Sequence, residues 1–311
     1  GKKRSVPFRV HYPLSGENHA VVVISHGAGG HIDTHFAQAK HLASHGFVSI
    51  CVEHVGSNLG RMTTGLRIAR NLRDMTHDAD EARNRPADIS FAIDSAIEWN
   101  KKHPVLKRRM DTTRIAVMGH SYGAYTAMVI CGIRPALTWF KPVIGTGKGL
   151  ADSLRDKRVS CGIAMSPQCP GEPFFVKESY ASLAVPLLGI SGTDDRQQSG
   201  EPPEHRRDAF SLWPAGGHVF VWLANAKHVD FTDSTGSERR MLPSSTRESV
   251  QHISRVATLM FLNTHLSSGP RKTDGLSVSS LRRYLLGAVE SVSVLTKPPA
   301  APRQERHPTH P

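Results

Sequence analysis

One short segment, RIAVMGHSYGAYTAM at residues 114–128, constrains the fold more than any other part of this chain. It begins with an apolar, strand-like run, passes through Ser121 between two glycines, and ends in small residues that are compatible with a helix. A strand that turns directly into a helix is typical of proteins in which helices connect parallel strands. The segment therefore predicts an α/β fold with a tight turn at the end of one strand.

The rest of the chain repeats this alternation of apolar runs and helical patterns. Runs such as AVVVIS and VPLLGIS are continuously hydrophobic, as expected for strands that helices cover on both faces. The predicted strands are residues 8–12, 20–25, 47–53, 114–118, 159–165, 185–191 and 219–223. The predicted helices are residues 36–45, 88–102, 121–131 and 250–266. We expect an open, mostly parallel sheet with helices on both faces.

The predicted organisation is one domain over residues 1–296 followed by a disordered tail over 297–311. The tail, KPPAAPRQERHPTHP, has too little apolar surface to bury. Residues 61–85 and 134–157 show no clear periodicity. We expect both to run over the carboxyl edge of the sheet, where α/β proteins bind ligands.

The composition argues against several functional classes. The formal charge is +12, but the 39 Lys and Arg residues are scattered and no aromatic residues are interleaved with them. We therefore expect a solvated basic surface and no nucleic-acid partner. The sequence contains no run of about 18 apolar residues, so no membrane span is predicted.

The four cysteines, Cys51, Cys131, Cys161 and Cys169, have no CxxC spacing, which argues against zinc and redox chemistry. Cys161 and Cys169 are near enough in sequence to pair in an oxidising compartment, although spacing does not fix their geometry. The chain begins GKKRSVPF without a methionine, as expected for a trimmed or mature form. An exported and a cytoplasmic location both remain open.

The turn in the first segment, Gly119-His120-Ser121-Tyr122-Gly123, matches the pattern G-x-S-x-G. Between a strand and a helix this pattern is typical of a nucleophile elbow, in which the flanking glycines allow a tight turn that exposes the serine hydroxyl. An ordinary strand-to-helix turn is the alternative interpretation. We predict that Ser121 is a nucleophile.

A serine nucleophile needs an imidazole base and a carboxylate that orients it, and in this type of fold they follow in the order Ser, acid, His. His228 follows the predicted strand HVFVWL, and Asp194 and Asp195 follow the strand VPLLGIS. We predict His228 as the base and Asp195 as the acid, with Asp194 and then Asp230 as alternatives. The other downstream histidines considered do not follow a strand end in a loop; these are His205, His218, His252, His265, His307 and His310.

The tetrahedral intermediate of such a reaction needs two N–H donors. One comes from the residue after the nucleophile, here Tyr122, and the other from a loop after an earlier strand. The glycine-rich segment SHGAGGH provides such a loop, with Ala28 as the expected donor. A flexible turn or a phosphate-binding loop is the alternative, but the segment lacks the G-x-G-x-x-G and Lys-Ser/Thr signatures.

A possible metal motif is also present. His31 and His35 have the i, i+4 spacing of a metalloprotease helix, but Ile32 stands where the general-base glutamate is required. We predict no metal and no cofactor.

Taken together, these motifs resemble the α/β-hydrolase superfamily, and in particular its dienelactone-hydrolase-like and platelet-activating-factor-acetylhydrolase-like serine esterases. The resemblance rests on VVVISHGAGG, GFVSICVEHVGSN, RPADISFAID, RIAVMGHSYGAYTAM, GIAMSPQ, LLGISGTDD and ANAKHVDF, which span about residues 5–265. It implies the α/β-hydrolase fold, a triad of Ser121, Asp195 and His228, and an oxyanion hole formed by the Ala28 and Tyr122 amides.

The chain also departs from these families at three points. Dienelactone hydrolases use a cysteine where Ser121 stands, the segment GTDDRQ is one residue shorter than usual, and Ala28 replaces the aromatic clamp of bacterial polyester hydrolases. We therefore predict a serine hydrolase that cleaves small or short-acyl carboxylic esters through an acyl-serine, with a small-molecule ester as its partner. An acyltransferase or peptidase with the same triad, or a non-catalytic binding protein on this fold, is the alternative.

Overall fold

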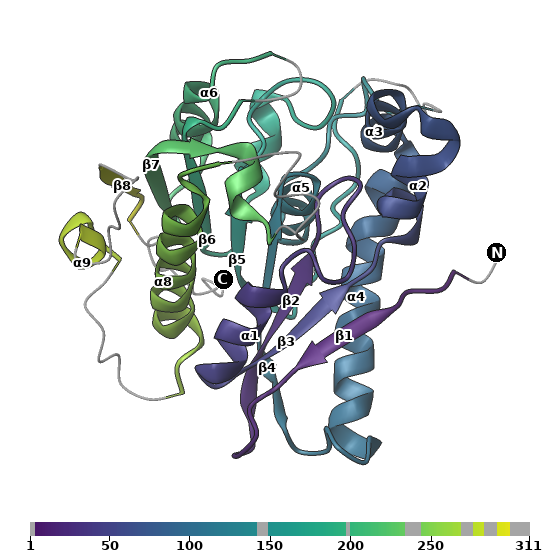
Figure 1. The fold of residues 1–311 in the computed structure, drawn as a ribbon, viewed down its shortest axis with the longest axis vertical. Helices are drawn as coiled ribbons and strands as arrows, with labels where there is room; N and C mark the ends of the chain where they lie inside the picture. The colour runs from purple at the N-terminus through teal and green to yellow at the C-terminus, as the bar shows by residue number, and fades with distance from the viewer. Residues whose placement is uncertain are drawn as a thin grey trace, which may run out of the picture.

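The structure, a computed structural model, describes residues 4–141, 149–196, 200–233, 244–268, 276–282 and 291–298. Within this part, eight strands form one sheet in the order β1-β3-β2-β4-β5-β6-β7-β8 (Figure 1). The strands are β1 (Phe8–His11), β2 (His19–Ser25), β3 (Phe47–Val52), β4 (Met110–His120), β5 (Val159–Met165), β6 (Leu187–Asp194), β7 (Val219–Lys227) and β8 (Val292–Thr296). Strands β2 to β7 are parallel to one another. At the edges of the sheet, β1 pairs antiparallel with β3, and β8 pairs antiparallel with β7. This sheet confirms the predicted α/β class.

The α-helices of the described residues are α1 (Phe36–Ser44), α2 (Leu59–Thr63), α3 (Ile68–His77), α4 (Ala79–Lys102), α5 (Tyr122–Ile130), α6 (Glu204–Asp208), α8 (Arg247–Leu266) and α9 (Val278–Arg282). Short 3-10 turns are η1 (Val55–Ser57), η2 (Thr64–Leu66), η3 (Lys177–Ser182), η4 (Ala209–Leu212) and η5 (His228–Phe231). None of the helices in these ranges is long and apolar enough to cross a bilayer.

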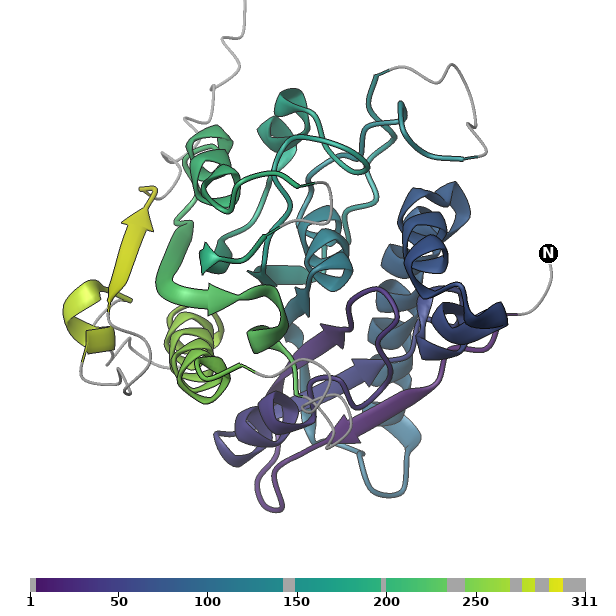
Figure 2. The ribbon, with the colours of Figure 1, turned by 45° about the horizontal axis from the view of Figure 1, so that its top comes forward.

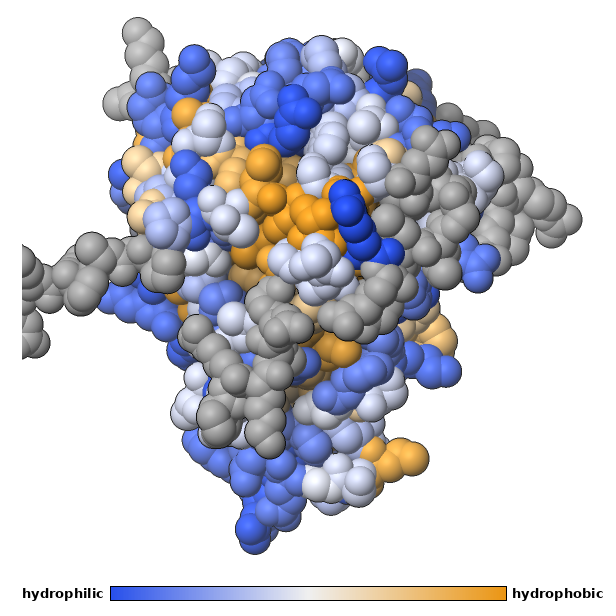
Figure 3. Space-filling view, turned by 90° about the vertical axis from the view of Figure 1, so that its left-hand side faces the viewer, coloured by the Kyte–Doolittle hydropathy of each residue, from blue (hydrophilic) through white to orange (hydrophobic). Residues whose placement is uncertain are grey.

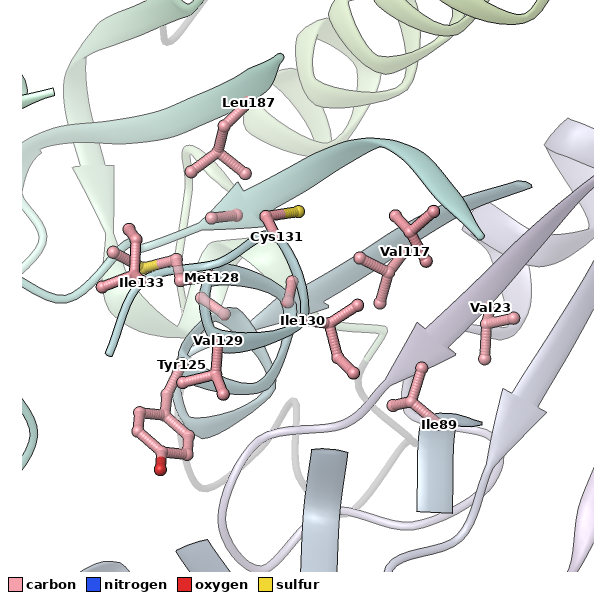
Figure 4. Packing of buried hydrophobic residues seen from close by; sticks show 14 of the residues in the cluster. Val23, Ile89, Val117, Tyr125, Met128, Val129, Ile130, Cys131, Ile133 and Leu187 are labelled. Atoms are coloured by element: carbon pink, nitrogen blue, oxygen red, sulfur yellow. The ribbon is translucent and has the colours of Figure 1, made fainter. Parts of the chain in front are cut away.

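Two hydrophobic cores lie on opposite faces of the sheet because side chains alternate along each strand. Val21 and Val23 pack on the face that α4 and α5 cover, whereas Val22 and Ile24 belong to the core beneath α1 and α8. Figure 4 shows the first core, in which residues of α5 lie among side chains from the strands and from α4. Burial of both faces explains why these strands are continuously hydrophobic in sequence.

Helix α4 is longer than predicted. It begins at Ala79 rather than at residue 88, and Pro86 lies inside it. The Asp78 side chain caps this helix by accepting hydrogen bonds from the N–H groups of Asp80 (2.9 Å) and Glu81 (3.2 Å). The predicted start was too late because proline normally ends a helical pattern. The true start is marked in the sequence by a capping aspartate followed by acidic residues.

The edge strand β8 was not predicted. It pairs with β7, and the N–H of Lys297 then donates to the His218 carbonyl (2.8 Å), while Pro298 accepts from Gly216 (2.8 Å) and Gly217 (3.0 Å). The first two residues of the predicted tail therefore bond to the loop before β7, and residues 299–311 lie outside the described residues. On the side of the molecule that carries β8 and α9, hydrophobic residues gather at the surface (Figure 3).

The helices α2, α3 and α6 lie beyond the carboxyl ends of the parallel strands (Figures 1 and 2). Residues 61–85, predicted as a non-periodic excursion over this edge, instead form most of α2, all of η2 and α3, and the first turns of α4. Their position at the carboxyl edge agrees with the prediction. Of residues 134–157, positions 142–148 lie outside the described part.

The possible disulfide is not formed. All four cysteines belong to the described part of the chain, each is buried, and none is joined in a disulfide. Cys161 lies inside β5 with its side chain in the core beneath α8, so its sulfur packs as an apolar group.

Candidate active site

Ser121 occupies the sharp turn between β4 and α5. Its backbone has φ 57° and ψ −117°, a conformation that non-glycine residues rarely adopt. A Cβ on Gly119 would collide with the Gly123 carbonyl, and a Cβ on Gly123 would collide with the carbonyl of Ser25. Glycine at both positions therefore lets the turn close, and strain of this kind is typical of a nucleophile elbow.

The structure brings the side chains of Ser121, His228 and Asp195 together. His228 Nε2 lies 3.0 Å from Ser121 Oγ, and His228 Nδ1 lies 2.7 Å from Asp195 Oδ1. Because a carboxylate only accepts hydrogen bonds, Nδ1 carries the proton and Nε2 can accept one from the serine hydroxyl. The three groups come from the ends of β4, β6 and β7, which meet at the carboxyl edge of the sheet.

The two other candidate carboxylates do not contact His228. Asp194 is the last residue of β6 and its side chain is exposed. Asp230 is buried, but its Oδ2 accepts hydrogen bonds from the Lys227 N–H (2.9 Å) and the Thr246 hydroxyl (2.6 Å). Adjacent residues at a strand end point in different directions, which is why only one of the two neighbouring aspartates reaches the imidazole.

Asp195 is fully buried, and its charge is stabilised by several groups. Burial alone would raise the pKa of the Asp195 carboxyl, but the positive Arg206 guanidinium and His228 outweigh it and hold this pKa well below its usual range. The hydroxyl of Ser191 donates to Asp195 Oδ2 at 2.7 Å. Asp195 is therefore ionised and able to orient His228 at neutral pH.

Arg206, in α6, is a site residue that the sequence did not indicate. Its Nε donates to the Asp195 carbonyl (3.1 Å) and lies 3.5 Å from Asp195 Oδ1. Its Nη1 donates to the carbonyls of Ser166 (3.1 Å) and Pro167 (2.8 Å). The scattered Lys and Arg residues predict a solvated basic surface, yet Arg206 is 3% exposed. No local pattern distinguishes it from its neighbour.

His120, the residue before Ser121, packs against His228. Their ring centroids lie 4.6 Å apart, and His120 is buried. Burial, reinforced by the nearby His228, holds the pKa of His120 well below its usual range. His120 is therefore a neutral ring beside the imidazole that would become charged, so it adds no second positive charge there.

The two predicted oxyanion donors, Ala28 and Tyr122, face the same cavity as Ser121. Tyr122 is the first residue of α5, so its N–H has no acceptor within the helix. In the loop after β2, Gly29 N–H donates to the Ser57 carbonyl (2.9 Å) and Gly30 N–H donates to Gly27 (3.1 Å). Within the described ranges, neither the Ala28 N–H nor the Tyr122 N–H donates a hydrogen bond to a backbone carbonyl. Both N–H groups are therefore free to donate to a ligand.

A cavity of about 660 Å³ opens beside these groups. Among the described residues, its lining includes Ala28, Ala69, Leu72, Arg73, Thr76, His77, Ser121, Tyr122, Gln168, Glu172, Pro173, Phe174, Arg206 and His228. The α3 residues among them bear out the expectation that residues 61–85 form part of the pocket. In the second predicted excursion, residues 134–157, none of the described residues lines it; Gln168 and residues 172–174 contribute to the wall instead.

A group of hydrogen-bonding and charged side chains lies at this cavity between α3 and the loop after β5. His77 Nε2 lies 2.7 Å from Glu172 Oε1, and Arg73 Nη2 lies 3.9 Å from the same oxygen. The apolar part of the wall comes from Ala69, Leu72 and Phe174. The cavity thus combines an apolar lining with charged side chains.

The two histidines of the possible metal motif, His31 and His35, have different surroundings. His31 Nδ1 accepts the Asp33 N–H (3.2 Å), while His35 is buried, and this burial lowers the pKa of His35 to about 4. In the portion of the chain that is described, no three His, Cys, Asp or Glu side chains are arranged to hold a metal ion.

No protein-family model matches the chain. Among curated proteins it is 23% identical to the platelet-activating factor acetylhydrolase of Cavia porcellus, over 74% of this chain and 53% of that protein. It is 25% identical to the Bos taurus protein of the same name, over 81% of this chain and 58% of that protein. It is also 27% identical to Cutinase 2 of Thermobifida cellulosilytica, over 41% of this chain and 40% of that protein.

The chain spans only somewhat more than half the length of the acetylhydrolases that it matches. The identities are low, but the match to the acetylhydrolases extends over most of this chain, and the match to the cutinases over less than half of it. These homologues of the chain are platelet-activating factor acetylhydrolases and cutinases, both of which are serine esterases of the α/β-hydrolase superfamily.

Proposed function

We propose that this protein is a carboxylic ester hydrolase that cleaves small or short-acyl esters through an acyl-serine intermediate. The observation that carries the proposal is the hydrogen-bonded series Ser121, His228 and Asp195 at the wall of a cavity of about 660 Å³. Relatives named acetylhydrolase and cutinase support the same reaction class.

In the first half of the proposed reaction, Ser121 Oγ attacks the ester carbonyl carbon while its proton passes to His228 Nε2. The carbonyl π electrons move onto oxygen, and the Ala28 and Tyr122 N–H groups donate to this oxyanion. The intermediate collapses when the bond to the alcohol oxygen breaks, and the leaving alcohol takes the proton from His228. Asp195 stays ionised throughout and stabilises the imidazolium.

In the second half, water replaces the alcohol. His228 Nε2 takes a proton from the water as its oxygen attacks the acyl carbon, and the same two N–H groups stabilise the second oxyanion. Breaking the bond to Ser121 Oγ releases the carboxylic acid, and His228 returns the proton to the serine. The net reaction consumes one ester and one water.

A fluorophosphonate probe tests this proposal, because only an activated serine reacts with it. We expect the probe to label Ser121, and we expect p-nitrophenyl acetate to be hydrolysed. Labelling of another residue, or none, contradicts the assignment. If Ser121 is labelled but no ester is hydrolysed, Ser121 is an activated serine that catalyses a different reaction.

The acyl chain length should affect the rate in a defined way. We expect kcat/KM for p-nitrophenyl esters to be highest for acetate to butyrate and to fall toward palmitate. A long chain would have to lie against the Glu172 carboxylate and remove its charge from water, which is unfavourable. The series is measured by p-nitrophenol release, and a continuous rise toward palmitate would contradict the short-acyl proposal.

Arg206 should control the acid side of the pH profile. Its positive charge lowers the pKa of Asp195, so Arg206→Met raises that pKa, and Asp195 becomes protonated at a higher pH. A protonated Asp195 no longer holds His228, so kcat/KM should fall more steeply at the acid end of the profile than in the wild type. The lost hydrogen bonds to Asp195 and the loop after β5 should also lower kcat/KM at neutral pH by about 10- to 100-fold.

Arg207 offers a matched control for this experiment. It is the next residue, but its guanidinium pairs with the exposed Asp208 (3.2 Å) rather than with the site. Arg207→Met should leave the pH profile of kcat/KM unchanged. Identical profiles for both variants would show that Arg206 does not act through Asp195.

A further inference from the structure

A second buried arginine, Arg85 of α4, lies beneath the proposed oxyanion donors. Its side chain is completely buried. Nη1 donates to the Ser57 hydroxyl (2.7 Å), Nε donates to the Thr126 hydroxyl (3.0 Å), and Nη2 donates to the Ser25 hydroxyl (3.1 Å) and to the His26 carbonyl. One guanidinium therefore joins β2, η1, α4 and α5.

Each of these contacts joins Arg85 to the segment that holds one of the two proposed oxyanion donors, Ala28 or Tyr122. On the Ala28 side, the partners of Arg85 are the residues that begin this loop and Ser57, whose carbonyl accepts the Gly29 N–H at 2.9 Å. On the Tyr122 side, the guanidinium lies 4.3 Å from the Tyr122 ring centroid, and the Thr126 hydroxyl donates to the Tyr122 carbonyl (3.0 Å). Arg85 is thus in contact with both segments that hold the donors.

A hydrogen-bond network through His54 connects the start of the oxyanion loop to α4. His54 Nε2 accepts from the Ser25 hydroxyl (2.9 Å), and His54 Nδ1 donates to Asp88 (2.9 Å). The His54 N–H donates to His26 Nε2 at 3.0 Å. Ser25, His54 and Asp88 repeat the donor order of a catalytic triad, but they are buried away from the cavity, so they act in structure only.

The charge of Arg85 is not neutralised by contact with a carboxylate. Glu81 and Asp88 are paired with Arg4 (3.3 and 3.0 Å), and no ion pair involves Arg85 anywhere in the described ranges. Burial lowers the pKa of Arg85 to about 10, so the guanidinium stays positive at neutral pH. Burial also holds the pKa values of His26 and His54 well below their usual range, so both rings are neutral. A buried positive charge therefore lies directly behind the oxyanion loop.

We propose that Arg85 is a positioning residue that holds the Ala28 and Tyr122 amides in place relative to Ser121, and that its buried charge favours the negative oxygen formed there. Preorganised dipoles and charges of this kind are effective because they need no rearrangement when the charge develops. The inference rests on the proposed function, since it assigns these two amides to an oxyanion hole.

The test compares Arg85→Met and Arg85→Lys with the wild type. The readouts are kcat and KM for p-nitrophenyl acetate per labelled active site, and the second-order rate of fluorophosphonate labelling, which also builds a negative oxygen at Ser121. For Arg85→Met we expect kcat and the labelling rate to fall by about 100-fold while KM changes little. Arg85→Lys keeps the charge but loses the planar arrangement of donors, so its rates should lie between those of Arg85→Met and the wild type.

Arg114 provides the matched control, because it makes comparable bonds at the opposite end of the sheet. Its guanidinium bonds to Asp111 (2.7 Å), the Leu266 carbonyl (2.7 Å) and the Asn18 carbonyl (2.6 Å). Arg114→Met should lower the melting temperature without changing the rates per active site. If Arg85→Met behaves in the same way, with both rates within about twofold of the wild type, Arg85 is a structural residue only and the proposal is wrong.

Two milder variants decide the question if Arg85→Met does not fold. Ser57→Ala and Thr126→Val each remove one anchor of the guanidinium, and each should lower the labelling rate several-fold; wild-type rates in both would overturn the proposal. A wild-type protein that is labelled but hydrolyses no ester would contradict the proposed function, and the labelling rates would still test Arg85. A wild type that does neither overturns both.

Discussion

The Ser121→Ala variant is expected to lose ester hydrolysis almost completely and to remain folded. Removal of Oγ deletes the atom that would form the acyl intermediate, and in a comparable triad such a loss lowers kcat by about 10⁶. The fold should persist because Ser121 makes its backbone hydrogen bond, from its N–H to the Met165 carbonyl (3.0 Å), independently of the side chain. Rates are measured with p-nitrophenyl acetate, and folding by circular dichroism.

Ser44 supplies the control for this variant. It is an exposed serine at the end of α1. Its hydroxyl donates to the His41 carbonyl (2.8 Å) and lies 3.2 Å from His45 Nδ1, so both of its contacts are local. Ser44→Ala should retain full activity and full fluorophosphonate labelling. If Ser121→Ala kept even about a tenth of the wild-type turnover, Ser121 would not be the nucleophile.

The second large effect is expected from Asp195→Asn. The amide can still occupy the space, but it no longer supplies the negative charge that fixes the His228 tautomer and stabilises the imidazolium. In a triad with otherwise intact geometry, this change lowers kcat by about 10⁴. The measurement is kcat with p-nitrophenyl acetate, together with the melting temperature, which shows whether the buried site still packs.

Asp194→Asn is the internal control, since the two residues are adjacent and undergo the same chemical change. Asp194 is exposed and does not contact His228, so we expect most of the activity to remain and stability to change by at most about 0.5 kcal/mol. The opposite pattern would move the acid to Asp194. If neither variant lost activity, the orienting carboxylate would lie on another strand.

The parts of this protein that could be predicted from sequence are those whose signal is local. The continuous apolar runs correctly indicated β2 to β7 because both faces of these strands are buried. Ser121 could be identified from the sequence because its turn has no space for a Cβ at positions 119 and 123, so both positions are glycine and the G-x-S-x-G pattern results. Helix α4 was predicted too short because Pro86 is normally a stop signal, although here the helix continues through it.

The rest depends on contacts between segments that are far apart in the chain. Sequence order left Asp194 and Asp195 as alternatives, because the direction of each side chain follows from the end of β6 in three dimensions. Arg85 and Arg206 are arginines, which are normally exposed, and only their carbonyl and hydroxyl partners from other elements make their burial possible. No sequence pattern marks such residues.

The location of α2 and α3 has a consequence for how this scaffold can diversify. This excursion contributes a wall to the cavity, but Ser121, Asp195 and His228 are all held by strand ends on the sheet itself. Substitutions, insertions or deletions in residues 59–77 can therefore reshape this cavity while the three residues of the proposed triad stay in place. Selection acting on this one excursion can retune substrate choice, so proteins that share the same sheet and triad can diverge toward quite different esters.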